Sequence, residues 1–142
     1  MRSFLKFWFP FLGYSVIIFC ISSLPADRVT FTRFFWDKGL HMLEYFPLGI
    51  SAAYALTNTW RLPAGAKGES ALAKAGPLGL IWVVSAALCF LYGLSDEFHQ
   101  GFVPGREVSI YDALADLAGA VFGAGTYLFV CNKDKSKAYA SH

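Results

Sequence analysis

The chain has 142 residues, enough for one domain, but 56% of them are hydrophobic and only 15% are charged. This composition excludes an ordinary soluble domain, whose surface needs more polar residues than the short connecting segments supply here. The net charge is only +2, and the Lys and Arg residues form no dense stripe, so a nucleic-acid partner is not expected.

Four apolar blocks define the predicted elements, at about residues 4–24, 40–59, 77–96 and 110–130. Each is close to the roughly 20 residues that an α-helix needs to cross the hydrocarbon of a bilayer. Residues 7–24 and 77–95 contain no charged side chain, whereas the second and fourth blocks contain ionisable residues. We therefore predict an all-α membrane protein in which residues 1–142 form a single bundle of four transmembrane helices.

The orientation of this bundle follows from the basic residues in its short loops and ends, because cytoplasmic loops carry an excess of Lys and Arg. One side would hold eight of them, Arg2, Lys6, Arg61, Lys67, Lys74, Lys133, Lys135 and Lys137. The other side would hold four, Arg28, Arg33, Lys38 and Arg106. The count predicts that both termini are cytoplasmic, in a multi-pass protein of a bacterial cytoplasmic (inner) membrane.

A first polar group opens the second block. At helical spacing Asp37, His41, Glu44, Tyr45 and Leu48 share one stripe. A charged side chain at the middle of a bilayer costs roughly 2.5 to 3.5 kcal/mol, so such residues are expected to be paired or functional. We expect the stripe to face the interior of the bundle.

A second polar group closes the third block and leads into the fourth. Asp96, Glu97, His99 and Gln100 precede Pro104-Gly105, a turn signal that presents Arg106 near the start of the last helix. We expect Arg106 to contact at least one carboxylate of the polar groups.

The start of the last block has two interpretations. Ser109 is a plausible N-cap with Asp112 as a capping-box acid, but this does not explain Asp116, one turn deeper. Asp112 and Asp116 fall on one face with Gly119 and Gly123. Because small residues four apart let helix backbones approach, this face is predicted to meet the other helices, with both aspartates pointing inward.

These motifs resemble the VanZ-like family. The resemblance rests on Asp37-Lys38, His41, Tyr45 and Leu48-Gly49, then on Asp96-Glu97, Gln100, Phe102, Pro104-Gly105-Arg106, Asp112, Asp116 and Gly119. It implies a bacterial membrane protein related to one linked to resistance to the glycopeptide antibiotic teicoplanin, but it assigns no catalytic step.

Three interpretations of the polar residues stay open. In the first, Lys38 and Arg106 bind the anionic group of an envelope lipid or lipid-linked glycan, because an Arg fork suits phosphate. In the second, the chain is a hydrolase or transferase acting on such a lipid. In the third, the residues form a purely structural ion network. A proton-coupled transporter is disfavoured because the polarity is one-sided and no repeated halves are found.

The candidate residues follow from these interpretations. The catalytic candidates are His41, Asp96, Glu97 and His99. The ligand-binding candidates are Lys38, His41, Glu44, Tyr45, Asp96, Glu97, Gln100, Arg106, Asp112 and Asp116. Two histidines with several carboxylates could ligate a divalent cation, and whether one binds is left open. Their spacing matches no compact metal signature, so neither a metal nor another cofactor is expected. The expected partner is a membrane lipid or a lipid-linked envelope precursor, and the oligomeric state is left open.

Overall fold

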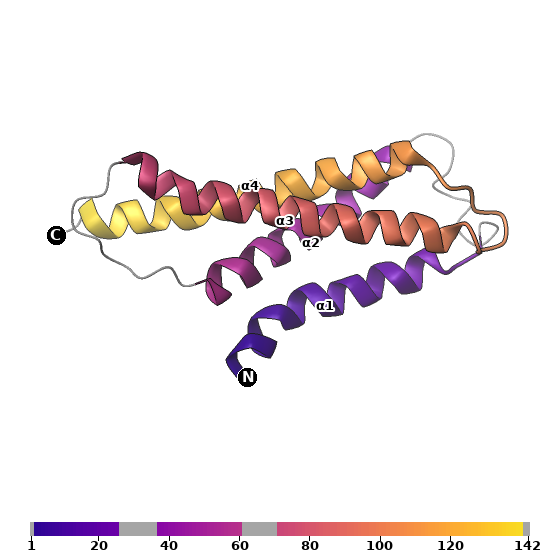
Figure 1. Ribbon diagram of the computed structural model, residues 1–142, viewed down its shortest axis with the longest axis horizontal. Coiled ribbons are helices and arrows are strands. Elements are labelled where there is room, and N and C mark those ends of the chain that lie inside the picture. Colours follow the sequence, from indigo (N-terminus) through magenta and orange to yellow (C-terminus); the bar gives the residue numbers. More distant parts are fainter. Residues whose placement is uncertain (1, 26–36, 61–70, 141–142) are drawn as a thin grey trace.

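The computed structural model describes residues 2–25, 37–60 and 71–140. Within them the chain forms four α-helices, α1 (Arg2–Ser22), α2 (Asp37–Thr59), α3 (Ala71–Gln100) and α4 (Ile110–Ala140). Figure 1 shows α2, α3 and α4 alternating in direction, with the turn between α3 and α4 at the opposite end from the C-terminus. The predicted all-α fold is confirmed. Four of the basic residues used to predict orientation, Arg28, Arg33, Arg61 and Lys67, lie outside the described residues.

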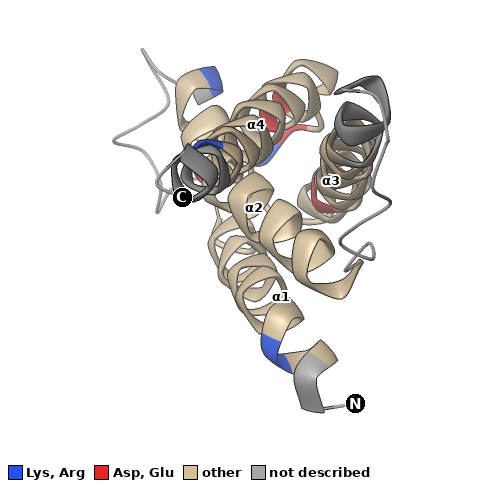
Figure 2. Cartoon of the chain, turned by 90° about the vertical axis from the view of Figure 1, so that its left-hand side faces the viewer, with Lys and Arg blue, Asp and Glu red and all other residues tan. Residues whose placement is uncertain are grey.

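Three of the helices are long and apolar enough to cross a membrane, at Phe4–Ser22, Leu78–Gln100 and Ile110–Lys133. Their outer faces carry large exposed apolar side chains, such as Phe9 on α1 and Phe129 on α4, which are 74% and 70% exposed. Large apolar surfaces of this kind favour contact with lipid rather than with water. Figure 2 shows the ribbons as mostly uncharged, with acidic residues confined to short segments.

Helix α2 is not among these three, although residues 40–59 were predicted to span. The structure suggests a physical reason, since α2 packs against each of the other helices. Leu48, Ala52 and Ala55 on α2 are fully buried. A helix that is covered by protein rather than lipid needs less hydrophobicity to be stable at that position.

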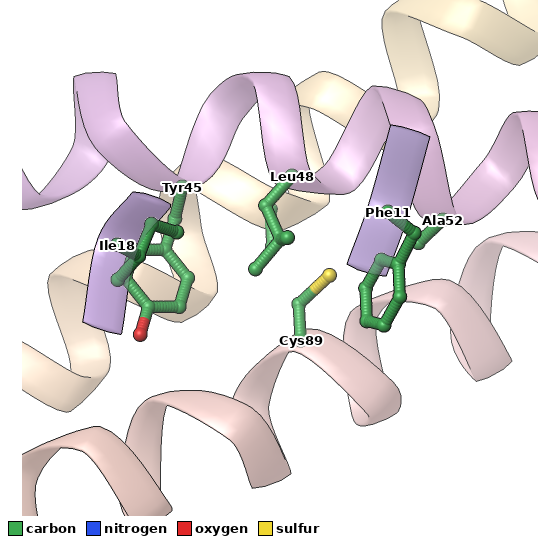
Figure 3. Packing of buried hydrophobic residues seen from close by; sticks show 7 residues of the cluster. Phe11, Ile18, Tyr45, Leu48, Ala52 and Cys89 are labelled. Atoms are coloured by element: carbon green, nitrogen blue, oxygen red, sulfur yellow. The ribbon is translucent and has the colours of Figure 1, made fainter. Parts of the chain in front are cut away.

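Of the two core clusters among the described residues, the first lies mainly where α1, α2 and α3 meet, and the second joins α2, α3 and α4. Phe11 and Ile18 of α1 pack with Tyr45 and Leu48 of α2 and with Cys89 of α3, as Figure 3 shows. A hydrogen bond from the indole Nε1 of Trp8 to Thr59 Oγ1 (3.0 Å) also ties α1 to α2. The first cluster and the Trp8–Thr59 hydrogen bond hold α1 mainly against α2.

The contact between α2 and α4 is made at backbone distance. A Cβ atom added at Gly119 would overlap the carbonyl group of Met42, and one added at Gly123 would overlap that of Phe46. From the other side, a Cβ atom at Gly49 would overlap the carbonyl group of Ala120. The predicted close-packing face of α4 is thus confirmed, and α2 is the helix that it meets.

Candidate functional site

The predicted polar residues gather at one end of the bundle, where α1 and α3 end and α2 and α4 begin. The turn between α3 and α4 brings the two polar groups together. Gly105 adopts a positive φ of 75°, a backbone conformation that glycine tolerates without strain. The sequence-based prediction of a turn at Pro104-Gly105 is therefore confirmed.

Ionisable side chains join α2 to α4 at two levels, one helical turn apart. The Nζ atom of Lys38 pairs with Asp112 Oδ1. Deeper in the bundle, His41 Nδ1 lies 2.9 Å from Asp116 Oδ1, and His41 Nε2 lies 3.9 Å from Asp112 Oδ2. Asp116 is only 1% exposed, so its charge depends on His41 and other protein groups rather than on bulk water. Both aspartates point into the bundle, as predicted.

The start of α4 differs from the expected capping box. The backbone N–H of Ser109 donates to Glu97 Oε2 at 2.8 Å, whereas the Asp112 carboxylate pairs with Lys38. The capping-box interpretation of Asp112 is therefore wrong. Glu97 from α3 takes the place of the local acid because the turn folds the end of α3 back beside Ser109.

Asp96 links α3 to α1. Its Oδ1 accepts a hydrogen bond from Ser22 Oγ at 2.6 Å, and its Oδ2 accepts one from Gln100 Nε2 at 2.8 Å. All three side chains are buried. Both oxygens of Asp96 thus have a partner, which makes this carboxylate a structural link between the helix ends.

The two histidines among the catalytic candidates, His41 and His99, lie in different surroundings. His99 lies 3.0 Å from Ser23 Oγ and stacks at a tilt on Phe19, with ring centroids 4.5 Å apart. It therefore belongs to the contact between α1 and α3. His41 instead faces the buried carboxylate of Asp116.

Arg106 does not form the expected ion pair within the described part of the chain. Its Nε donates to the backbone carbonyl of Leu24 at 3.3 Å. The reason lies in the neighbouring carboxylates, which have other partners: Asp96 is bound to Ser22 and Gln100, and Asp112 to Lys38. Arg106 remains half-buried at the end of the bundle.

Several buried oxygens in the same region lack a hydrogen bond from the described residues. They are Tyr45 Oη, Glu97 Oε1 and Asp116 Oδ2. Glu44 is half-buried and interacts electrostatically with His41, Asp96 and Asp116. In addition, one ligand atom each from His41, Glu97 and Asp116 lies within 4.8 Å of the others. Buried polar atoms without partners are uncommon, so this inner group calls for an explanation.

Sequence reasoning missed the contribution of α1. Ser22 and Ser23 bind Asp96 and His99, and the Leu24 carbonyl accepts from Arg106. A pair of serines at the end of an apolar run was the available signal, although such a pair is also common at an ordinary helix end. Asp37, the first residue of the predicted polar stripe, begins α2, but its side chain lies outside the described part.

The sequence model of the VanZ/LLP1 family matches residues 2–131, so the chain belongs to this family. The match includes every residue of the candidate site and supports the resemblance noted from the motifs. Comparison with curated proteins and with solved structures gave no match.

Proposed function

We propose that this member of the VanZ/LLP1 family binds an anionic cell-envelope lipid, or a lipid-linked glycan, at the end of the bundle where Lys38 and Arg106 lie. Membership of the family and three helices able to cross a membrane make the chain a membrane protein. A ligand that reaches this site along the bilayer would present its headgroup near the helix ends.

The observation that carries the proposal is the state of Arg106. Its hydrogen bond within the described part of the chain runs from Nε to a neutral carbonyl, and no described carboxylate pairs with the guanidinium group. An Arg fork can donate two parallel hydrogen bonds to a phosphate group, and these charge-assisted bonds are stronger than neutral ones. Lys38, whose side chain is 50% exposed, adds a second positive charge at the same end.

The proposal requires this end of the bundle to face outward, with both termini in the cytoplasm. Eight basic residues on one side against four on the other support that orientation. Labelling of Pro104→Cys and Lys133→Cys with a membrane-impermeant thiol reagent in intact cells tests it, with the unsubstituted chain measuring the background from its three native cysteines. We expect reaction at Pro104→Cys alone. Reaction at Lys133→Cys alone would show that the orientation is the opposite of the one proposed.

Native mass spectrometry of the detergent-purified protein tests lipid binding. We expect retained phosphate- or pyrophosphate-bearing lipid in the parent protein and about tenfold less in Arg106→Lys, since lysine keeps the charge but loses the fork. Lys133→Ala, which removes a basic residue from the far end of α4, is the matched control. Equal retention by Arg106→Lys would contradict bidentate binding, and a loss of folding in that variant would favour a structural ion network.

The same proposal includes an effect of the protein on the susceptibility of cells to teicoplanin. Cells that express the parent chain are expected to differ in teicoplanin susceptibility from cells that express Arg106→Lys at equal membrane levels. Identical susceptibility of the two would mean that lipid binding at Arg106 has no role in the response to glycopeptides.

A membrane-embedded hydrolase or transferase is the second candidate. The observation that favours it is the pairing of His41 Nδ1 with Asp116 Oδ1 at 2.9 Å, an arrangement that orients an imidazole for proton transfer. His41→Gln distinguishes the two functions. It should leave bound lipid intact if the chain only binds, and it should cause accumulation of unprocessed lipid if the chain catalyses a reaction.

A further inference from the structure

The inner part of the polar cluster brings four carboxyl groups together with one imidazole among the described residues. Glu44, Glu97 and Asp116 each interact electrostatically with Asp96 and with His41. Of the described cations at this end, Lys38 pairs with Asp112, which is outside this group of four, and Arg106 donates a hydrogen bond to a carbonyl group. An excess of buried carboxylates is costly unless a cation lies among them.

Three of these side chains converge from three different helices. His41 on α2, Glu97 on α3 and Asp116 on α4 each offer a ligand atom, and the three atoms lie within 4.8 Å of one another. In a tetrahedral site with bonds of about 2.0 to 2.2 Å, the donor atoms lie about 3.3 to 3.6 Å apart. Side-chain movements of less than about 1 Å would therefore bring the group to coordination distance.

A second observation points to a ligand, independently of this clustering. Glu97 is 4% exposed and Asp116 is 1% exposed, yet Glu97 Oε1 and Asp116 Oδ2 accept no hydrogen bond from the described residues. Their other oxygens are held in place, Glu97 Oε2 by the Ser109 N–H and Asp116 Oδ1 by His41. Each carboxylate is thus fixed through one oxygen while its second oxygen is buried without a partner.

We infer that His41, Glu97 and Asp116 form a binding site for a divalent transition-metal ion. One imidazole nitrogen with two carboxylate oxygens suits Zn²⁺ or Mn²⁺ better than Mg²⁺, which prefers oxygen ligands and retains its water. Three protein ligands leave a further coordination position for water or for a ligand oxygen. The site stands on its own contacts and does not depend on lipid binding.

Zn²⁺ alone is the probe for the first test. The full-length protein is purified in detergent with a chelator, the chelator is removed, and Zn²⁺ binding is measured by competition with a chromophoric chelator and by elemental analysis after dialysis. We expect one equivalent of Zn²⁺ per chain. His41→Ala and Asp116→Asn should each weaken binding at least tenfold, since even an indirect supporting residue at a metal site is worth about 10- to 100-fold.

His99→Ala is the matched control, because His99 lies at the same end of the bundle but contacts Ser23 and Phe19 instead. It should bind Zn²⁺ as the parent protein does. If the parent binds no Zn²⁺ at one equivalent, or if binding survives in both His41→Ala and Asp116→Asn, the inference is overturned.

Thermal unfolding keeps the test decisive if one variant folds poorly. Zn²⁺ should raise the unfolding temperature of the parent protein and of His99→Ala, because an ion that binds only the folded state stabilises it. Glu97→Gln keeps an acceptor for Ser109 and removes the buried charge, so it should fold without metal and should gain little from Zn²⁺. An equal Zn²⁺-induced shift in Glu97→Gln would show that Glu97 is not a ligand.

Discussion

Helices α2 and α4 meet in two regions, and the contacts differ in kind. Around Gly119 and Gly123 the two backbones touch, with no space for even a Cβ atom. One to three turns nearer the start of α4, the same helices are joined by charged side chains, through Lys38 with Asp112 and His41 with Asp116. The glycine region allows one arrangement, because backbone atoms cannot move aside. The charged region can exchange one partner for another, which a binding site requires.

The comparison predicts that the largest effect comes from the glycine region. Gly123→Ala places a Cβ atom on the carbonyl of Phe46 and should lower the free energy of unfolding by about 3 kcal/mol, the upper part of the usual cost of overpacking. The control is Gly79→Ala on α3, where a Cβ atom meets nothing within 4 Å. Unfolding of both variants in detergent with increasing denaturant measures the difference. Similar stability of the two variants would mean that α2 and α4 do not pack in this way.

An intermediate effect is expected where α1 joins the polar end. Ser22→Ala removes the donor to Asp96 Oδ1 and leaves a buried carboxylate oxygen without that bond, at a cost of about 1 to 3 kcal/mol. Ser95→Ala is the control, since the exposed Ser95 hydroxyl donates only to the Tyr92 carbonyl in its own helix. It should change stability by less than about 0.5 kcal/mol. The same unfolding assay compares them, and an equal loss in both variants would argue against the Ser22–Asp96 link.

The smallest effect is expected at the outer ion pair. A double-mutant cycle with Lys38→Met and Asp112→Asn should give a coupling free energy of no more than about 1 kcal/mol, because Lys38 is half-exposed and solvent screens the pair. The coupling should shrink further at high salt. A coupling above about 2 kcal/mol would mean that the Lys38–Asp112 pair is not weakened by solvent and is held as firmly as the contacts of the glycine region.

The sequence alone was sufficient to predict where the helices lie and which face of α4 packs against a neighbouring helix. Apolar runs of about 20 residues predict membrane-spanning helices. Four helices were found at those places, and three of them are long and apolar enough to cross a membrane. Helical periodicity placed Asp112, Asp116, Gly119 and Gly123 on one face of α4, and that face meets α2. Pro104-Gly105 predicted the turn, because glycine readily adopts the positive φ observed there.

Only the tertiary structure decided which partners these residues have. Periodicity fixes the face on which a side chain lies, but not the depth and rotation of one helix against the next. For this reason the acceptor for the Ser109 N–H is Glu97 rather than Asp112, and Arg106 binds the Leu24 carbonyl rather than a carboxylate. The grouping of His41, Glu97 and Asp116 has the same origin. Their ligand atoms come from three helices, so no spacing along the chain reveals them, and shifts of a few ångströms between helices determine whether they meet.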